Sequence, residues 1–258
     1  MIFTKLLVLI LSQHLTGYSD LHEVYKVSDP ASTYSATIDS FCSTVFGLLR
    51  SEVSKPDSQV FKKALTGFLN LKAGNRIKKN ILTIIDLSLS CNLDRMWIID
   101  VDKMEVLHSS LVAHGQKSGV EFASRFSNIP SSLQSSLGFY LTGEIFNSKH
   151  GMSLCLDGVE PGINDKARER GIIMHGAWYV SRDFINRYGV LGRSFGCPAI
   201  PMEDHEKFIN LLSGKSCIYI HYPDNKYLND SRMFSAETAL HGMTNLLSEL
   251  TGIFNPGN

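Results

Sequence analysis

The chain has 258 residues, 43% of them hydrophobic, and its 25 basic and 25 acidic residues leave no net charge at pH 7. This length is ample for the core of one domain with appendages and is short for two large independent domains. The sequence has no dense lysine and arginine patch with interleaved aromatic residues, so nucleic acid is excluded as an expected partner.

The first nineteen residues have the pattern of a signal peptide. Lys5 is the positive region, residues 6–11 are a short apolar run, and Gly17 and Ser19 are small residues before Asp20. The alternatives are an N-terminal strand or a membrane anchor, but the run is too short to cross a bilayer. We expect cleavage near Ser19, export, and a periplasmic or cell-wall location, with no stable membrane span.

Residues 20–75 are predicted to be a helical segment. Two stretches, residues 33–52 and a second one after Pro56, carry apolar residues at helical spacing, and residues 72–75 form a plausible C-terminal stop. The first stripe consists of Tyr34, Ile38, Phe41, Val45 and Leu48, and the second of Phe61, Ala64, Leu65, Phe68 and Leu71. The two stretches predict a helical hairpin in front of the catalytic part.

Residues 76–225 are predicted to be the catalytic domain, with a β-rich core. Short strand-like runs occupy residues 81–89, 96–101, 105–114, 138–146, 152–158, 171–176 and 217–222. Asp100 and Asp102 resemble a carboxylate pair, but alternation in a strand followed by a turn explains them better. A short helix is expected over residues 203–212, still within the catalytic domain. Residues 226–258 are predicted to be a C-terminal helical extension, with a helix over residues 235–250.

The segment Gly192–Pro201 contains the residue with the clearest chemical potential, Cys197, twenty-two positions after His175. A nucleophilic cysteine needs a base, a positive local potential and backbone N–H groups aimed at the developing oxyanion. Gly196 permits close approach of a substrate, and Pro198 biases Cys197 toward an extended conformation. The alternative is that Cys197 is a buried cysteine in a tight turn and His175 a hydrogen-bonded histidine at the end of a strand.

Two neighbours of the cysteine are candidate substrate-binding residues. Arg193 can bind a carboxylate with two hydrogen bonds, and Ser194 can donate or accept one. The segment is also a literal GxSxG match, which raises the alternative of a Ser194 hydrolase. A nucleophile elbow needs a helix directly after the serine turn, and Pro198 and Pro201 disfavour one.

Several stretches together resemble the L,D-transpeptidase catalytic domain (YkuD-like) family, in its murein L,D-transpeptidase branch. A histidine follows an apolar strand, and a serine-x-glycine-cysteine tetrad follows later. The resemblance covers roughly Pro56 to Pro223. The segments that carry it are Ile172–Ser181, Gly192–Pro201, Leu111–Gly119, Arg125–Asn128 and Ser135–Glu144.

This resemblance implies an α+β fold with Cys197 as nucleophile and His175 as its base. Enzymes of this family cleave a peptidoglycan stem peptide after an L-centre and pass the acyl group to an amine or to water. The implied activity is an L,D-transpeptidase; the alternatives are an L,D-carboxypeptidase and a non-catalytic wall-binding module. Gly176, beside the proposed base, and His114, in a matching stretch, are candidate substrate-binding residues, and His150 is a further candidate for the groove.

The tetrad departs from its commoner form at two positions. That form has histidine before the glycine and arginine two residues after the cysteine, where this chain has Phe195 and Ala199. Arg193 is then the nearest candidate in sequence for a positive charge beside the carboxylates of the acyl donor.

No metal or other cofactor is expected. The nine histidines form no HExxH or HxH arrangement and the five cysteines form no CxxC. Four cysteines, Cys42, Cys91, Cys155 and Cys217, can form up to two disulfides around a free Cys197, or each can fill core space. The expected partners are peptidoglycan stem peptides, and the oligomeric state is left open.

Overall fold

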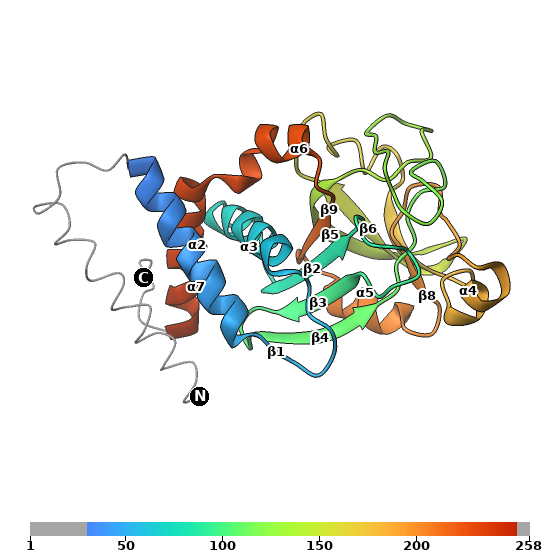
Figure 1. The fold of residues 1–258 in the computed structure, drawn as a ribbon, viewed down its shortest axis with the longest axis horizontal. Coiled ribbons are helices and arrows are strands. Elements are labelled where there is room, and N and C mark those ends of the chain that lie inside the picture. Colours follow the sequence, from blue (N-terminus) through green and yellow to red (C-terminus); the bar gives the residue numbers. More distant parts are fainter. Residues whose placement is uncertain (1–29, 252–258) are drawn as a thin grey trace, which may run out of the picture.

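The computed structural model describes residues 30–251, so the expected signal peptide at residues 1–19 lies outside the described part. At its centre is one nine-stranded sheet with the order β1-β4-β3-β2-β9-β5-β6-β7-β8 (Figure 1). The pairs β1–β4, β2–β9 and β7–β8 are parallel, and the other neighbours are antiparallel. The mixed sheet with flanking helices confirms the predicted α+β class.

The strands follow the predicted runs closely, with two short additions. Every residue of β2, β3 and β9 is buried, as expected of apolar strands in the centre of a covered sheet. The short strands β1 and β8 were not predicted. The bounds are β1 Arg50–Ser51, β2 Ile81–Asp86, β3 Met96–Asp100, β4 Glu105–Ser110, β5 Gly138–Ser148, β6 Gly151–Gly158, β7 Ile173–Ala177, β8 Ala199–Pro201 and β9 Cys217–His221.

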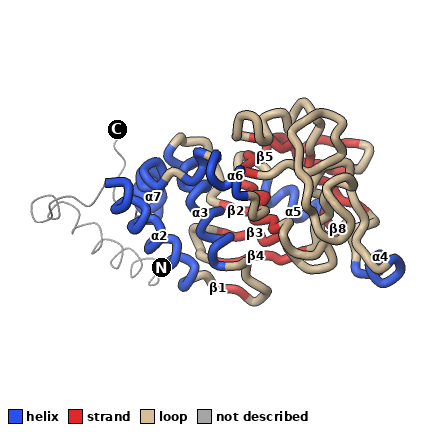
Figure 2. The backbone as a smooth tube through the Cα atoms, turned by 45° about the horizontal axis from the view of Figure 1, so that its top comes forward, coloured by secondary structure: helices blue, strands red, loops and turns tan. Residues whose placement is uncertain are grey.

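Three helices, α2 (Pro30–Leu48), α3 (Ser58–Ala73) and α7 (Ala236–Thr251), pack together at one end of the molecule (Figures 1 and 2). Helix α3 also covers the sheet, where Gly67 approaches the Phe139 ring so closely that a Cβ would lie 2.0 Å from it. Helix α5 (His205–Leu212) meets the same strand through Thr142, whose hydroxyl donates to the Leu212 carbonyl at 2.7 Å. Since Phe139 and Thr142 point to opposite faces of β5, α3 and α5 cover opposite faces of the sheet.

The helical hairpin is confirmed, with one correction. The first helix ends at Leu48 and not at Glu52, because the next residues pair with the edge of the sheet. The Arg50 N–H donates to the Met104 carbonyl at 2.8 Å, and the Arg50 guanidinium binds Glu105. These contacts extend the backbone into β1.

The turn predicted at Asp102 and Lys103, after the strand that carries Asp100, is present. Asp100 accepts a hydrogen bond from the Lys103 N–H at 3.0 Å, and Asp102 accepts one from the Asn80 amide at 2.8 Å. The short elements α4 (Arg182–Tyr188), α6 (Asn225–Asp230) and the 3₁₀ helix η1 (Arg232–Phe234) were not predicted.

Helices α3 and α7 approach each other at Gly242, and a substitution there tests this contact. A Cβ on residue 242 would lie 1.8 Å from the Leu69 carbonyl oxygen of α3. The Gly242→Ala variant is expected to lose about 1–3 kcal/mol of unfolding free energy in urea denaturation, because two backbones must separate. Gly47→Ala is the control, since nothing lies within 4 Å of its Cβ position and alanine favours a helix. Equal stability of the two variants would contradict the close contact.

Candidate active site

Strands β7 and β8 bring His175 and Cys197 to the same edge of the sheet. His175 pairs with Ala199 in the parallel register, and Cys197 lies two residues before Ala199. An offset of two residues on neighbouring strands corresponds to about 8 Å between Cα atoms, a distance that two side chains can bridge. The described residues include no hydrogen bond between the two side chains, so contact requires a small movement or a substrate.

The ring of His175 is buried, and its hydrogen bond fixes the tautomer. Nδ1 lies 3.0 Å from the Gly176 carbonyl oxygen. A carbonyl only accepts, so Nδ1 carries the proton and the lone pair is on Nε2. Burial lowers the pKa of His175, and the nearby His150, Lys149 and His205 lower it further against the opposing Gly176 bond. The His175 imidazole is therefore neutral at pH 7.

Two other histidines enclose His175. His150, from the turn between β5 and β6, stacks on the His175 ring with centroids 4.1 Å apart and planes 19° apart. His205, from the start of α5, packs over Gly176, where a Cβ would lie 2.7 Å from the His205 ring. Gly176 thus contributes its carbonyl and its lack of a side chain to the placement of the His175 ring.

Cys197 is partly buried against the first residues of β7. Its thiol donates to the Gly171 carbonyl, with Sγ and O 3.7 Å apart. Burial raises the pKa of the Cys197 thiol, while the Ile173 N–H and the positive charges of Arg170 and Lys149 oppose the rise. A resting thiolate is thus disfavoured, and the resting pair is a neutral thiol and a neutral imidazole.

This charge state predicts how Cys197 reacts with iodoacetamide. Only the thiolate is alkylated, so the rate at Cys197 is expected to rise about tenfold per pH unit up to pH 9.0, the ordinary thiol pKa, without a plateau. Peptide mapping by mass spectrometry separates Cys197 from the other cysteines. A plateau below pH 7 would instead indicate a preformed thiolate and imidazolium pair.

Ser194 holds the cysteine loop together from within. It is buried, and its hydroxyl accepts from the Gly196 N–H at 3.1 Å and donates to the Cys197 carbonyl at 2.6 Å. The Gly196 N–H is therefore engaged within the loop, where it is not free to donate to an oxyanion. Among the described residues no acceptor binds the Cys197 N–H, which leaves that group available.

The surroundings of Ser194 also bear on the serine hydrolase alternative. Its hydroxyl is committed to the loop, and the next element is strand β8 rather than a helix. A nucleophile elbow has a helix at that point. The Ser194 alternative therefore lacks both a free hydroxyl and the required backbone.

His114 lies in a buried network and not on an open groove. Its Nδ1 accepts from the Arg95 guanidinium at 2.8 Å, and its Nε2 lies 3.3 Å from the Gly119 carbonyl. Burial and the charge of Arg95 lower its pKa to about 4. The His114 carbonyl accepts from the Ser194 N–H at 2.9 Å, so this residue positions the cysteine loop through its backbone.

Arg193 is exposed, and its guanidinium donates to the Gly119 carbonyl at 3.3 Å. The positive charges that favour a Cys197 thiolate come instead from Arg170 and Lys149. The Arg170 guanidinium is fixed by four hydrogen bonds to residues 127–136, including 2.6 Å to the Gln134 carbonyl. Sequence reasoning missed both residues, because neither lies in the cysteine segment.

Tyr179 is a further neighbour of the cysteine. Burial, together with negative charge on Cys197, raises its pKa to about 12, so it remains a neutral phenol. Its ring packs so closely on Gly192 that a Cβ there would lie 2.5 Å from it. It belongs to a segment that the sequence singled out, IIMHGAWYVS, although no role was assigned to it.

All five cysteines lie within residues 30–251, and the structure shows each of them unpaired. The same residues contain no group of three or more His, Cys, Asp or Glu side chains arranged to hold a metal ion. Nor does this part of the chain include a helix with the length and apolar character needed to cross a membrane.

The family model for the L,D-transpeptidase catalytic domain matches residues 52–221, which is more than half of the chain. The match includes the sheet from β2 to β9 and both His175 and Cys197. The chain belongs to the L,D-transpeptidase catalytic domain family. No curated protein matches it.

Solved structures give distant matches. The cell shape determining protein Pgp2 from Campylobacter jejuni is 16% identical, with 62% of this chain and 57% of that chain covered and a TM-score of 0.37. An L,D-transpeptidase from Mycobacterium smegmatis is 11% identical, with 55% and 59% covered and a TM-score of 0.34. One from Stackebrandtia nassauensis is 10% identical, with 72% and 92% covered and a TM-score of 0.35. The chain thus covers less than two thirds of the length of the first two.

Proposed function

We propose that this protein is a cysteine-dependent L,D-transpeptidase that acts on peptidoglycan stem peptides through a thioester acyl-enzyme. One observation carries the proposal: a neutral His175, whose Nε2 has no hydrogen-bond partner among the described residues, lies on the strand next to the Cys197 segment at one edge of the sheet. Membership in the family supports the same reaction class. Export to the periplasm or cell wall is part of the proposal, because the substrate lies there.

The first step is acylation. His175 Nε2 takes the thiol proton as Cys197 Sγ attacks the carbonyl carbon after the L-centre, and the Cys197 N–H donates to the oxyanion. The tetrahedral intermediate then collapses. The C–N bond breaks, and the proton on His175 leaves with the amine of the released D-residue.

The second step transfers the acyl group. An amine from another stem peptide, deprotonated by His175, attacks the thioester and forms a cross-link while the thiol regains its proton. Water at the same position yields a shortened stem peptide, which is the carboxypeptidase alternative. Arg170 and Lys149 favour the thiolate leaving group in this step, as they favour the attacking thiolate in the first.

The proposal is tested on the chain from Asp20 onward with purified tetrapeptide muropeptides and mass spectrometry of the products. A cross-linked dimer is expected with the wild-type chain and not with Cys197→Ala. Tripeptide without dimer would replace the transpeptidase by a carboxypeptidase. Dimer formation by both proteins would refute Cys197 as the nucleophile.

A non-catalytic wall-binding module is the second candidate, and the raised pKa of the Cys197 thiol favours it, since an inert thiol fits a module. The same assay separates the candidates. Unchanged muropeptide with wild-type protein, together with co-sedimentation of that protein with insoluble peptidoglycan, would support the module.

A further inference from the structure

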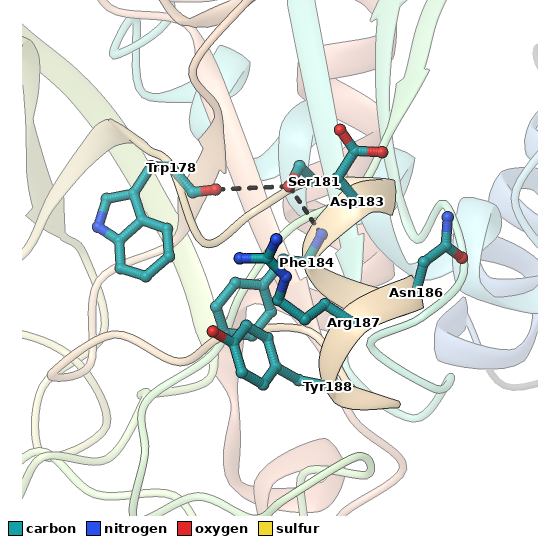
Figure 3. A pocket seen from close by; sticks show the side chains of 7 residues that line it. All are labelled: Trp178, Ser181, Asp183, Phe184, Asn186, Arg187 and Tyr188. Atoms are coloured by element: carbon teal, nitrogen blue, oxygen red, sulfur yellow. Dashed lines mark hydrogen bonds between the residues drawn. The ribbon is translucent and has the colours of Figure 1, made fainter.

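A pocket lies around helix α4, in the segment that follows strand β7 (Figure 3). It is an open hollow of about 710 Å³. Its lining contains aromatic and polar side chains and no aliphatic ones. The lining residues are Trp178, Ser181, Asp183, Phe184, Asn186, Arg187 and Tyr188.

Three aromatic rings form its apolar surface. Trp178 is 71% exposed and Tyr188 is 57% exposed, which is unusual for large aromatic residues of a folded domain. The Phe184 ring lies 5.5 Å from that of Trp178 and 4.4 Å from that of Tyr188, centroid to centroid. Phe184, Arg187 and Tyr188 share one face of α4, and Figure 3 shows them facing the Trp178 side.

Three polar side chains of the pocket are unengaged. Within residues 30–251, neither Asp183 nor Asn186 nor Arg187 makes a side-chain hydrogen bond or an ion pair. Arg182, the neighbouring cation on the same helix, is by contrast bound to Asp94 at 2.7 Å and to the Asn92 carbonyl. On the side of α4 that faces Trp178, the pocket thus offers the Arg187 guanidinium to a ligand, while Asp183 and Asn186 point away from Trp178 (Figure 3).

The pocket is carried on a rigid support. Beneath α4, a small separate core is formed by Cys91, Leu111, Ala113, Ala177, Val180, Leu191 and Ala199. Asn92 binds both sides of the turn that follows α4. Its side chain donates to the Gly189 carbonyl at 3.1 Å and accepts from the Leu191 N–H at 2.9 Å. A surface held in this way loses little entropy on binding.

The pocket is linked to the proposed active site through the end of strand β7. Trp178 directly follows the last residue of β7 and lies three residues after His175. That separation is about 10 Å along an extended strand. A substrate that carries both a sugar and a stem peptide is long enough to span this separation.

We propose that this pocket binds the glycan strand of peptidoglycan, with a sugar ring stacked on Trp178. This inference rests on the proposed function. The C–H face of a pyranose is apolar and slightly positive, and it complements the negative face of an aromatic ring. The hydroxyl and acetamido groups at the ring edge match the donors of Arg187, whose side chain lies on the Trp178 side of α4 (Figure 3).

The test is a tryptophan fluorescence titration of the chain from Asp20 onward carrying Cys197→Ala. The chain has two tryptophans, and Trp97 is only 3% exposed, so a response reports Trp178. Peptide-free glycan strands are the probe, and free stem tetrapeptide without sugar is the comparison. We expect a saturable blue shift with the glycan and at least tenfold weaker binding by the Trp178→Ala variant in co-sedimentation with insoluble peptidoglycan.

Phe122→Ala serves as the matched control, because it removes another exposed aromatic ring outside the pocket and is expected to bind like the parent protein. A response to the tetrapeptide alone, or undiminished peptidoglycan binding by Trp178→Ala, would overturn the glycan proposal. Neither readout requires turnover. Loss of glycan binding and loss of acyl transfer are therefore separate outcomes.

Discussion

The His175→Asn variant is expected to form product about 100- to 10,000-fold more slowly than the wild-type chain, the usual contribution of a general base. Asparagine preserves a donor for the Gly176 carbonyl but has no counterpart of Nε2. Because the Cys197 thiol has a raised pKa, thiolate is scarce without a base to take the proton. The measurement is the initial rate of muropeptide consumption.

The pH profile distinguishes loss of the base from damage to the fold. In the wild-type chain the Nε2 lone pair is available above the lowered pKa of His175, so activity is expected to fall only as the pH drops below 6.5. The variant is expected to lack this acidic limb. His108→Asn, which changes a partly exposed histidine on β4, is the control and keeps wild-type activity. A variant that retains both rate and acidic limb would contradict the assignment of the base.

The Arg95→Ala variant is expected to lose about 3–5 kcal/mol of unfolding free energy, the usual cost of breaking a buried charged network. Arg95 is fully buried, and burial lowers its pKa to about 10. Its guanidinium donates twice to the Val112 carbonyl, at 3.2 and 2.9 Å, once to Leu89 and once to His114. Alanine leaves these acceptors unpaired in a cavity.

Urea denaturation measures this loss, and Arg182→Ala provides the comparison. Arg182 is an exposed arginine with an ion pair to Asp94, so its removal is expected to cost at most about 1 kcal/mol. Since the segment held by Arg95 also bonds the cysteine loop, Arg95→Ala protein that remains folded is expected to turn over more slowly. Equal stability of the two variants would show that the buried network contributes nothing.

The fold was largely predictable because its strands are short apolar runs separated by turns. The periodicity of residues 81–86 and 96–100 is local information, and so are the stripes of α3 and α7. The parts that were missed depend on distant partners. Strand β8 exists because His175 and Ala113 pair with Ala199 from two sides, and β1 exists because Arg50 meets Met104.

The candidate site was predictable only where a reactive residue and the residues that surround it are close together in the sequence. The cysteine segment and His175 are such places. Arg170 and Lys149 lie on other loops, so no spacing relates them to Cys197. The hydrogen bond from the Gly196 N–H to the Ser194 hydroxyl was also not predictable from the sequence, because it depends on the direction of that hydroxyl.

The helical layer of α2, α3 and α7 lies at one end of the molecule, while β8 and α4 lie at the other (Figure 1). The first and last described residues, Pro30 and Thr251, both belong to that layer. A reporter domain or surface linker joined to either of them would therefore extend away from Cys197. Immobilising the protein through these helices should leave the cysteine edge facing the solution, where an insoluble polymer can reach it.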